Sequence, residues 1–306
     1  MATMPATRPP AAERARKKPR DDTRTALLFV AAAGIGLIVF YVVPLVRGVW
    51  LSFQEWDVLS DPVFVGLENY RRMFADPVFW NAIKVTLQYV VVNIGIQTVV
   101  ALGVAVLLQR LTRSVFWRSV VLTPYLISNV VAGILFLWIL DFQLGIGTTI
   151  LEWLGLGRIP FLTSESWGII TIALINVWRH MGYTALLLFA GLQTIPGHLY
   201  EAARIDGASE WRMFRSITMP LLRPILGMVL IVSIIGSFQV FDTVSVTTNG
   251  GPVDATRVLQ LYIYDNAFAQ FNFGYASALS VALLVILLVV TVIQYRVTRA
   301  GQSDLR

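Results

Sequence analysis

Residues 276–295 read ASALSVALLVILLVVTVIQY, a stretch without a charged side chain. A helix crosses the hydrocarbon layer of a bilayer with roughly 20 apolar residues, because it hydrogen-bonds every backbone N–H and C=O within the segment. A membrane β-barrel would instead show strands of about ten residues that alternate between apolar and polar. The stretch therefore predicts a membrane-spanning helix and argues against a barrel.

Stretches of similar length and apolar character recur upstream. Of the 306 residues in the chain, 56% are hydrophobic and only 14% are charged, whereas a soluble domain carries about 25% charged residues. The sequence therefore predicts an all-α, polytopic membrane protein with six transmembrane helices. The other five predicted spans are residues 26–46, 85–108, 115–140, 167–192 and 225–241.

Basic residues are distributed unevenly over the predicted loops. If the N-terminus lies inside, arginine and lysine gather in residues 1–25, 109–118, 193–224 and 296–306, whereas acidic residues outnumber basic ones in the opposite loops. Because loops rich in Lys and Arg stay in the cytoplasm, both termini are expected there. In a soluble protein the net charge of +6 would raise nucleic acid as a partner. Here the sorting by loop accounts for it, and no nucleic-acid partner is expected.

Composition also divides the chain along its length. The N-terminal segment mixes Pro, Ala, Arg and Lys without apolar periodicity, which predicts a disordered basic arm that contacts anionic lipid headgroups. The predicted parts are residues 1–25 for this cytoplasmic arm, 26–82 for the first transmembrane helix and an external interfacial segment, 83–297 for the core transmembrane domain, and 298–306 for a cytoplasmic tail.

Two external segments have helical spacing. Leu67, Tyr70 and Phe74 recur at i, i+3 and i+7, which predicts a short interfacial helix. Residues 256–271 are apolar and aromatic and predict a second helix at the outer surface.

The loop between the fourth and fifth predicted spans is the most informative one. Residues 194–224 read TIPGHLYEAARIDGASEWRMFRSITMPLLRP. Thr194 or a neighbour can cap a helix whose first turn tolerates Pro196, and Gly207 can take the positive φ that ends it. A second helix follows and leads into the fifth span. The pattern predicts a helix–turn–helix at the cytoplasmic membrane surface.

Two features suit this loop for docking. Ala202, Ala203 and Ala208 let another backbone approach closely, and Glu201 offers a carboxylate to a partner arginine. Spacing and composition alone favour an amphipathic surface linker, because internal loops of membrane proteins often form surface helices.

Particular residues of the loop resemble a known motif. Glu201-Ala-Ala-x-x-Asp206-Gly207-Ala208 is similar to the EAA loop of the permease subunits of binding-protein-dependent ABC importers, and most similar to the carbohydrate branch of the maltose and glycerol-3-phosphate type. Further matches are Phe214, Ile217, Pro220 and Pro224 in the loop, Pro124, and residues 64–70, 192–196, 238–242, 250–252 and 274–278.

The resemblance implies a type I ABC importer permease fold in a bacterial cytoplasmic (inner) membrane. It also implies a second homologous permease subunit, two ATPase subunits that receive the EAA loops, an extracellular solute-binding protein and a carbohydrate-like solute. The coupling contact to the ATPase would be formed by Glu201, Ala202, Ala203, Asp206, Gly207 and Ala208.

The chain lacks the means to bind ATP through a P-loop. Such a loop ends in Gly-Lys-Ser/Thr, and the lysines are Lys17, Lys18 and Lys84, none of which follows a glycine. No cofactor is therefore expected on this chain, and ATP and Mg²⁺ are expected on a separate ATPase.

Polar side chains inside the predicted spans mark a candidate solute path, because polar groups are costly in hydrocarbon and serve function or helix association there. Asn176, Arg179 and Tyr183 share one helix face. Such a face can hydrogen-bond sugar hydroxyls while an aromatic ring covers the apolar side of a sugar, and Arg179 would also suit an anionic solute. The candidate path comprises Asn176, Arg179, His180, Tyr183, Gln239 and Asp242.

A structural interpretation of these residues stays open. Arg179 would then pair with a carboxylate such as Asp242, and the other polar groups would join helices. The same interpretation applies to Asn93, Gln97, Tyr125 and Asn129.

Together these features favour the transmembrane subunit of an ATP-driven importer that moves a sugar or sugar derivative by alternating access. The alternative is a stand-alone secondary, ion-coupled transporter, which would usually show inverted repeats and acidic or histidine proton relays. An enzyme is not expected, because no cluster of His, Asp, Glu or Ser appears. No metal site is expected either, since the chain has no cysteine and only His180 and His198.

Overall fold

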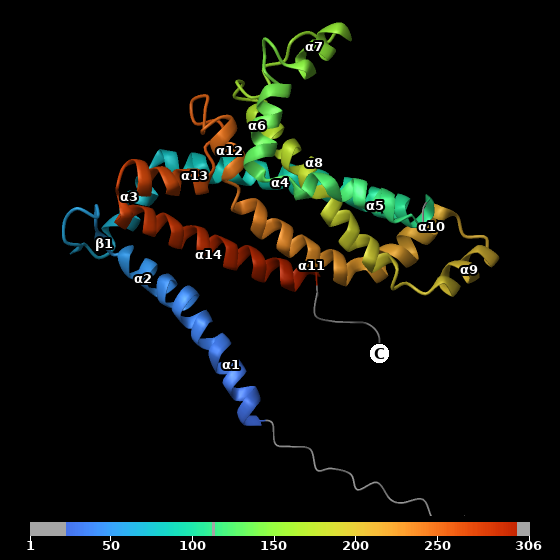
Figure 1. Ribbon diagram of the computed structural model, residues 1–306, viewed down its shortest axis with the longest axis horizontal. Helices are drawn as coiled ribbons and strands as arrows, with labels where there is room; N and C mark the ends of the chain where they lie inside the picture. The colour runs from blue at the N-terminus through green and yellow to red at the C-terminus, as the bar shows by residue number, and fades with distance from the viewer. Residues whose placement is uncertain (1–22, 112–113, 299–306) are drawn as a thin grey trace, which may run out of the picture. The chain divides into compact units, whose positions relative to one another are not determined.

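The computed structural model describes residues 23–111 and 114–298 (Figure 1). Most of the predicted basic arm and of the predicted tail lies outside these residues. The chain separates into two compact units, residues 1–47 and 48–306. Over the described ranges, helices dominate and five of them are long and apolar enough to cross a membrane. A bent helix pair supplies the sixth span, so the predicted all-α membrane architecture is confirmed.

The first span is helical throughout, as predicted. It consists of α1 (Thr23–Leu37), a π-helical turn η1 (Ile38–Val42) and α2 (Val43–Leu51). The π-turn ends two residues before Pro44, with the Val43 N–H donating to the Ile38 carbonyl. Since proline brings no N–H to the helix ladder, a locally widened turn is one way for the helix to continue past it.

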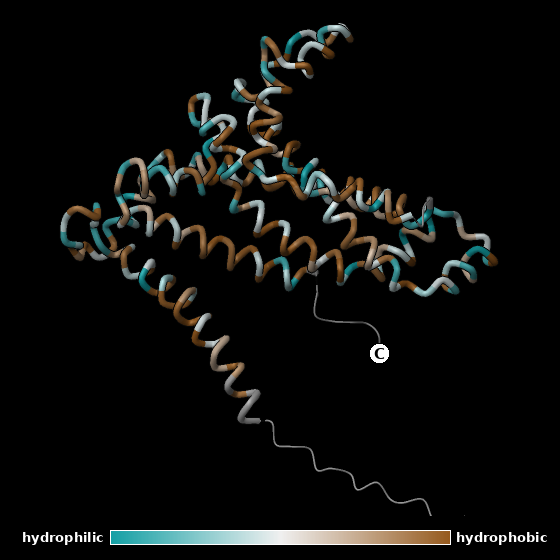
Figure 2. Tube along the Cα trace, viewed as in Figure 1, coloured by the Kyte–Doolittle hydropathy of each residue, from teal (hydrophilic) through white to brown (hydrophobic). Residues whose placement is uncertain are grey.

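Four long helices form the body of the second unit. Fully buried Ala101, Ala105 and Ala185 lie between α4 and α8, and such small residues let the helix backbones approach closely in a membrane. Figure 2 shows hydrophobic residues along the length of α14. The four helices are α4 (Pro77–Leu111), α8 (Gly168–Leu192), α11 (Met219–Phe238) and α14 (Phe273–Thr298).

The third span is broken rather than continuous, which corrects the prediction for residues 115–140. Its two halves meet at an angle of 89°. Pro124 lies in a 3₁₀ turn, and Ile127 and Ser128 are extended, with ψ of 136° and 146°. Because proline lacks the donor that a helix interior needs, the α-helix stops here. The segments are α5 (Val115–Leu122), η2 (Thr123–Leu126) and α6 (Asn129–Ile139), followed by α7 (Ile146–Trp153).

The fifth span begins earlier than predicted. Like the third span, it is broken, and its break lies at the far end. Helical residues run without interruption from Glu210 to Phe238, and a π-turn at Phe214–Thr218 ends two residues before Pro220, a widened turn that lets a helix continue past a residue without an N–H. At the other end, Gln239, Val240 and Phe241 interrupt the helix before α12. The segments are α10 (Glu210–Met213), the π-turn η3 (Phe214–Thr218), α11 and α12 (Asp242–Thr247).

Short elements cap the end of the second unit opposite the 194–224 loop. A two-stranded antiparallel sheet pairs Gln54 with Phe64 and Glu55 with Val63. The predicted interfacial helix is present as α3, and the predicted helix in 256–271 is divided into α13 and a π-turn. The elements are β1 (Gln54–Glu55), β2 (Val63–Phe64), α3 (Glu68–Ala75), α13 (Leu259–Tyr264) and η4 (Asp265–Ala269).

The carboxylate of Asp76 ties these outer elements together. Its Oδ2 atom accepts hydrogen bonds from the hydroxyls of Tyr262 at 2.5 Å and Tyr275 at 2.7 Å, and its Oδ1 atom accepts one from the Val78 N–H at 2.8 Å. Burial alone would raise the pKa of Asp76, but the hydrogen bonds outweigh it and hold the pKa below its usual value. Asp76 therefore joins α4, α13 and α14 through its charged form.

We expect Asp76→Asn to lower the stability of the chain at pH 7 by about 1–2 kcal/mol, because hydrogen bonds to a charged acceptor are stronger than those to a neutral one. With a depressed folded-state pKa, the contribution of Asp76 is complete above its unfolded pKa and is lost as pH falls through the folded value. Thermal unfolding in detergent, followed by tryptophan fluorescence, should show a lower midpoint at pH 7 and a weaker loss of stability below about pH 4 in the variant. The control is Asp61→Asn, at an exposed acid of the same region; equal midpoints for the two variants would contradict this role.

Candidate functional site

The 194–224 loop folds as a helix–turn–helix. Helix α9 (Gly197–Ile205) ends with Gly207 at φ +74°. The Gly207 N–H donates to the Arg204 carbonyl and the Ala208 N–H donates to the Ala203 carbonyl, which is the hydrogen-bond pattern of a Schellman cap with glycine at the left-handed position. The predicted end of this helix is confirmed. Thr194 does not cap its start, because its hydroxyl donates back to the Gly191 carbonyl.

The six residues predicted to couple to an ATPase lie together around this turn. Four of them are exposed, whereas Ala203 and Ala208 are half-buried beneath the turn. Two large apolar side chains, Ile205 and Trp211, are 87% and 69% exposed beside them. The turn therefore presents a carboxylate, small residues and an uncovered apolar surface on one projecting loop, a combination suited to contact with another protein.

Polar contacts that sequence reasoning missed attach this loop to the transmembrane helices. The Glu210 carboxylate lies 2.5 Å from the guanidinium of Arg110 at the end of α4 and 3.6 Å from that of Arg204 in α9. The hydroxyls of Tyr200 and Thr218 are 2.9 Å apart and join α9 to the base of α11. Exposed ion pairs of this kind stabilise by at most about 1 kcal/mol each, so they orient the loop more than they stabilise it. The partners are too distant in sequence for a spacing rule to reveal them.

A cavity of about 250 Å³ lies between the helices at the level of the two breaks. Many of the side chains in its wall are polar. Five of the six residues predicted for a solute path line it: Asn176, His180, Tyr183, Gln239 and Asp242. Asn93, Gln97, Tyr125 and Asn129, each interpreted as structural when taken alone, line the same cavity, as do Tyr89, Thr184, Ser233, Ser237, Phe241 and Thr243.

Hydrogen bonds between helices hold the cavity wall in place. Asn93 donates to the Ser237 hydroxyl at 2.9 Å and Gln97 donates to the Thr184 hydroxyl at 2.8 Å. Asn129, at the start of α6, donates to the Asp242 carboxylate at 3.1 Å at the start of α12. The Oδ1 atoms of Asn93 and Asn129 are buried and have no hydrogen-bond partner, so acceptors in the wall remain free for hydroxyl groups.

Arg179 lies behind this wall and is not among the residues that line it. Its Nε donates to the Ile127 carbonyl at 2.6 Å and its Nη2 to the Tyr125 carbonyl at 3.2 Å. Asp242 instead accepts from Asn129, and among the described residues Arg179 forms no ion pair with an acid. The suggested pairing of Arg179 with Asp242 is therefore wrong, since the carbonyls at the break in the third span take the guanidinium.

His180 is held by two neighbours in α8. Its Nδ1 lies 3.0 Å from the Asn176 carbonyl and its Nε2 lies 2.8 Å from Nη1 of Arg179. A carbonyl can only accept and a guanidinium can only donate, so these contacts require a proton on Nδ1 and none on Nε2. The imidazole is thereby fixed as a neutral part of the wall.

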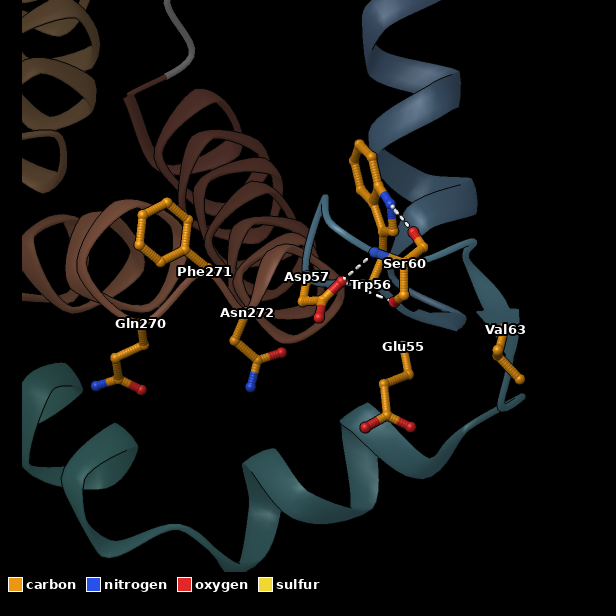
Figure 3. A pocket seen from close by; sticks show the side chains of 8 residues that line it. All are labelled: Glu55, Trp56, Asp57, Ser60, Val63, Gln270, Phe271 and Asn272. Atoms are coloured by element: carbon orange, nitrogen blue, oxygen red, sulfur yellow. Dashed lines mark hydrogen bonds between the residues drawn. The ribbon is translucent and has the colours of Figure 1, made fainter.

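A second cavity, of about 420 Å³, opens on the outer elements. It lies between the loop around Trp56 and residues 270–272, which are joined by a 2.9 Å hydrogen bond from the Phe273 N–H to the Trp56 carbonyl. In Figure 3 the side chains of Glu55, Gln270 and Asn272 extend to the same side, while the Trp56 indole turns toward Ser60. Phe271, at φ +56°, adopts the left-handed backbone conformation that costs a bulky residue free energy. Sequence patterns gave no sign of this cavity.

The sequence of this chain is similar to those of a known protein family. The sequence matches the family described as binding-protein-dependent transport system inner membrane component over residues 78–300. The chain belongs to this family. It is therefore a multi-pass permease component of a binding-protein-dependent importer, and the resemblance found in residues 201–208 is confirmed. Nothing supports the alternative of a stand-alone ion-coupled transporter.

Individual members of the family are similar over nearly the whole chain. The sulfoquinovosyl glycerol transport system permease protein SmoG of Agrobacterium fabrum is 36% identical over 91% of this chain and 91% of its own length. The trehalose/maltose transport system permease protein MalF of Thermococcus litoralis is 33% identical over 86% of this chain and 90% of its own length. Among solved structures, a bacterial ABC transporter that imports the acidic polysaccharide alginate has a chain of the same fold, with a TM-score of 0.79, 23% identity, and coverage of 93% of this chain and 99% of that one.

Gly207 provides a direct test of the turn in this permease component. An added Cβ would meet no atom within 4 Å at Gly207 or at Gly197, but only Gly207 has a positive φ. We expect Gly207→Ala to destabilise the end of α9 by about 1–2 kcal/mol, the cost of a left-handed conformation with a Cβ, and Gly197→Ala to be neutral or favourable. Limited trypsin digestion should cleave at Arg204 and Arg212 faster in Gly207→Ala than in the parent protein. In Gly197→Ala the cleavage rate should not change. Equal cleavage rates in the two variants would show that the positive φ at Gly207 does not affect the stability of the end of α9.

Proposed function

We propose that the chain forms one half of the translocation pathway for a sugar or sugar derivative, with the cavity between the two helix breaks as the solute site. The observation that carries the proposal is the chemistry of its wall. Amide, hydroxyl and carboxylate groups from α4, α6, α8, α11 and α12 converge there beside tyrosine rings, and this combination suits a ligand with many hydroxyls and an apolar ring face.

The relatives agree in the class of solute that their names state. One is named for sulfoquinovosyl glycerol, one for trehalose and maltose, and one for arabinooligosaccharides. These solutes differ in charge and size but share the polyhydroxylated sugar ring, the feature that the amides and tyrosines of the cavity match. Phosphorylated and neutral sugars both stay within the proposed class.

In the proposed assembly a second homologous permease completes the pathway, and the 194–224 loop of each permease docks into an ATPase subunit that holds ATP and Mg²⁺. Glu201 faces a basic side chain of that subunit, while Ala202, Ala203, Asp206, Gly207 and Ala208 let its backbone approach. The outer cavity and residues 256–271 face the extracellular solute-binding protein. Supporting this division of labour, the permease has no P-loop lysine of its own.

The energy source is tested by reconstituting the permease with its partner permease and ATPases in proteoliposomes and measuring uptake of radiolabelled trehalose, maltose and sulfoquinovosyl glycerol from the binding protein. We expect uptake that requires ATP and is lost in Glu201→Ala, which removes the carboxylate at the docking surface. Glu68→Ala, at another exposed acid, is the matched control. Uptake by the lone chain that is driven by an ion gradient and insensitive to Glu201→Ala would contradict the proposal.

The solute site is tested at Gln239, whose amide lines the cavity and has no hydrogen-bond partner within residues 23–111 and 114–298. We expect Gln239→Ala to raise the apparent KM for uptake about tenfold, because one hydrogen bond to the solute is lost. The thermal midpoint should not change, since no internal bond is broken. Gln143→Ala, at an exposed amide far along the chain, serves as control, and an unchanged KM in Gln239→Ala would place the solute elsewhere.

A further inference from the structure

The bend between η2 and α6 exposes backbone polar groups within a span. A helix leaves its last carbonyls without partners from its own ladder, and no water is present in hydrocarbon to replace them. At this bend the Ile127 N–H donates to the Pro124 carbonyl, which leaves the Tyr125 and Ile127 carbonyls to be satisfied from outside the segment.

Arg179 of α8 supplies both missing donors. Its Nε reaches the Ile127 carbonyl at 2.6 Å and its Nη2 reaches the Tyr125 carbonyl at 3.2 Å. The planar fork of a guanidinium can serve two acceptors at once, and the positive charge also complements the negative end of the α5–η2 helix. The third direction of the fork is occupied by the neutral His180 ring at 2.8 Å, so the donors of the guanidinium are directed toward the protein.

Neighbouring residues of α8 also contact the first half of the third span. A Cβ at Gly182 would lie 1.9 Å from the Val121 carbonyl oxygen, so only glycine allows α5 to approach α8 this closely. One residue further, the Tyr183 ring stacks on the Tyr125 ring with centroids 4.5 Å apart and an interplanar angle of 11°. Arg179, Gly182 and Tyr183 together form a seat on α8 for the end of the first half of the third span.

We propose that Arg179 is a positioning residue that holds the bend of the third span on α8. Through Tyr125 and Asn129, which flank the bend and line the cavity, it sets the shape of the cavity wall. Its charge does not contact the solute. The link to transport rests on the proposed function, whereas the anchoring of the bend does not depend on it.

Two substitutions separate a donor role from a charge role. Arg179→Gln places an amide nitrogen at the chain position of the Arg179 Nε, so the bond to the Ile127 carbonyl can form without the charge. Arg179→Met has similar length and no donor. If Arg179 anchors the bend, glutamine retains most of the function and methionine loses it; if Arg179 binds an anion, the two variants are equally defective.

The anchoring is measured by electron paramagnetic resonance on the full-length chain in nanodiscs. The chain has no cysteine, so a single nitroxide can be attached at Leu126→Cys, 75% exposed just before the bend, or at the control position Val99→Cys, 72% exposed on α4. We expect Arg179→Met to increase nitroxide mobility at position 126 and leave position 99 unchanged, with Arg179→Gln close to the parent protein. Identical spectra at position 126 for arginine, glutamine and methionine would overturn the proposal.

Transport supplies an independent readout in the reconstituted complex. With neutral maltose and anionic sulfoquinovosyl glycerol as probes, we expect Arg179→Met to reduce uptake of whichever probe the parent carries and Arg179→Gln to restore most of it. A loss confined to the anionic probe and equal in both variants would overturn the proposal. If the parent complex carries neither probe, the solute class under the proposed function fails, and the spectra still decide the anchoring.

A third variant, Tyr183→Leu, changes the other contact between α8 and the bend and leaves Arg179 in place. It removes the ring stack on Tyr125 while Arg179 keeps both hydrogen bonds. We expect a smaller gain in mobility at position 126 in Tyr183→Leu than in Arg179→Met. A gain at least as large in Tyr183→Leu would contradict the leading role of Arg179.

Discussion

The structure depends on the requirement that every backbone N–H and C=O inside hydrocarbon be hydrogen-bonded. Continuous helices meet it by themselves, but the third and fifth spans are interrupted in the middle of the helix bundle. The hydrogen bond from Asn129 to Asp242 joins the second halves of both spans at their first residues, and α8 holds the first half of the third. The breaks are therefore supported by neighbouring helices, and the space they open becomes a polar cavity in an apolar body.

The same arrangement links the cytoplasmic loop to the cavity. An uninterrupted helical path runs from Glu210 within the loop to Phe238 beside the cavity, and a helix transmits a displacement along its axis because its hydrogen-bonded ladder is stiff. The loop is held to this path by the contact of Tyr200 with Thr218 and to α4 by the contact of Glu210 with Arg110. A movement of the loop would therefore reach two helices that line the cavity, which is a physical route for coupling to the proposed ATPase subunit.

Sequence reasoning predicted the features that arise from local patterns. Apolar length predicted five of the spans. Gly207 predicted the end of α9, and residues 201–208 indicated the family. The third span was predicted as continuous although Pro124 lies within it, because periodicity alone does not reveal a right-angle bend, which depends on the neighbours that satisfy the freed carbonyls. Arg179 illustrates the same limit: its position on a polar face was clear from spacing, whereas its partners are backbone atoms of another span. The contacts of Glu210 with Arg110 and of Asp76 with Tyr262 join residues far apart in sequence, and no local pattern encodes them.

We propose that the two breaks enclose the solute site. Electron cryo-microscopy of the complete importer, trapped with solute bound in the membrane, would show where the solute lies. We expect solute density in the cavity, within hydrogen-bonding distance of Gln239 and of the free oxygen of Asn129, with the third span still bent on Arg179. Density bound elsewhere, with this cavity filled by side chains and the third span straight, would contradict it.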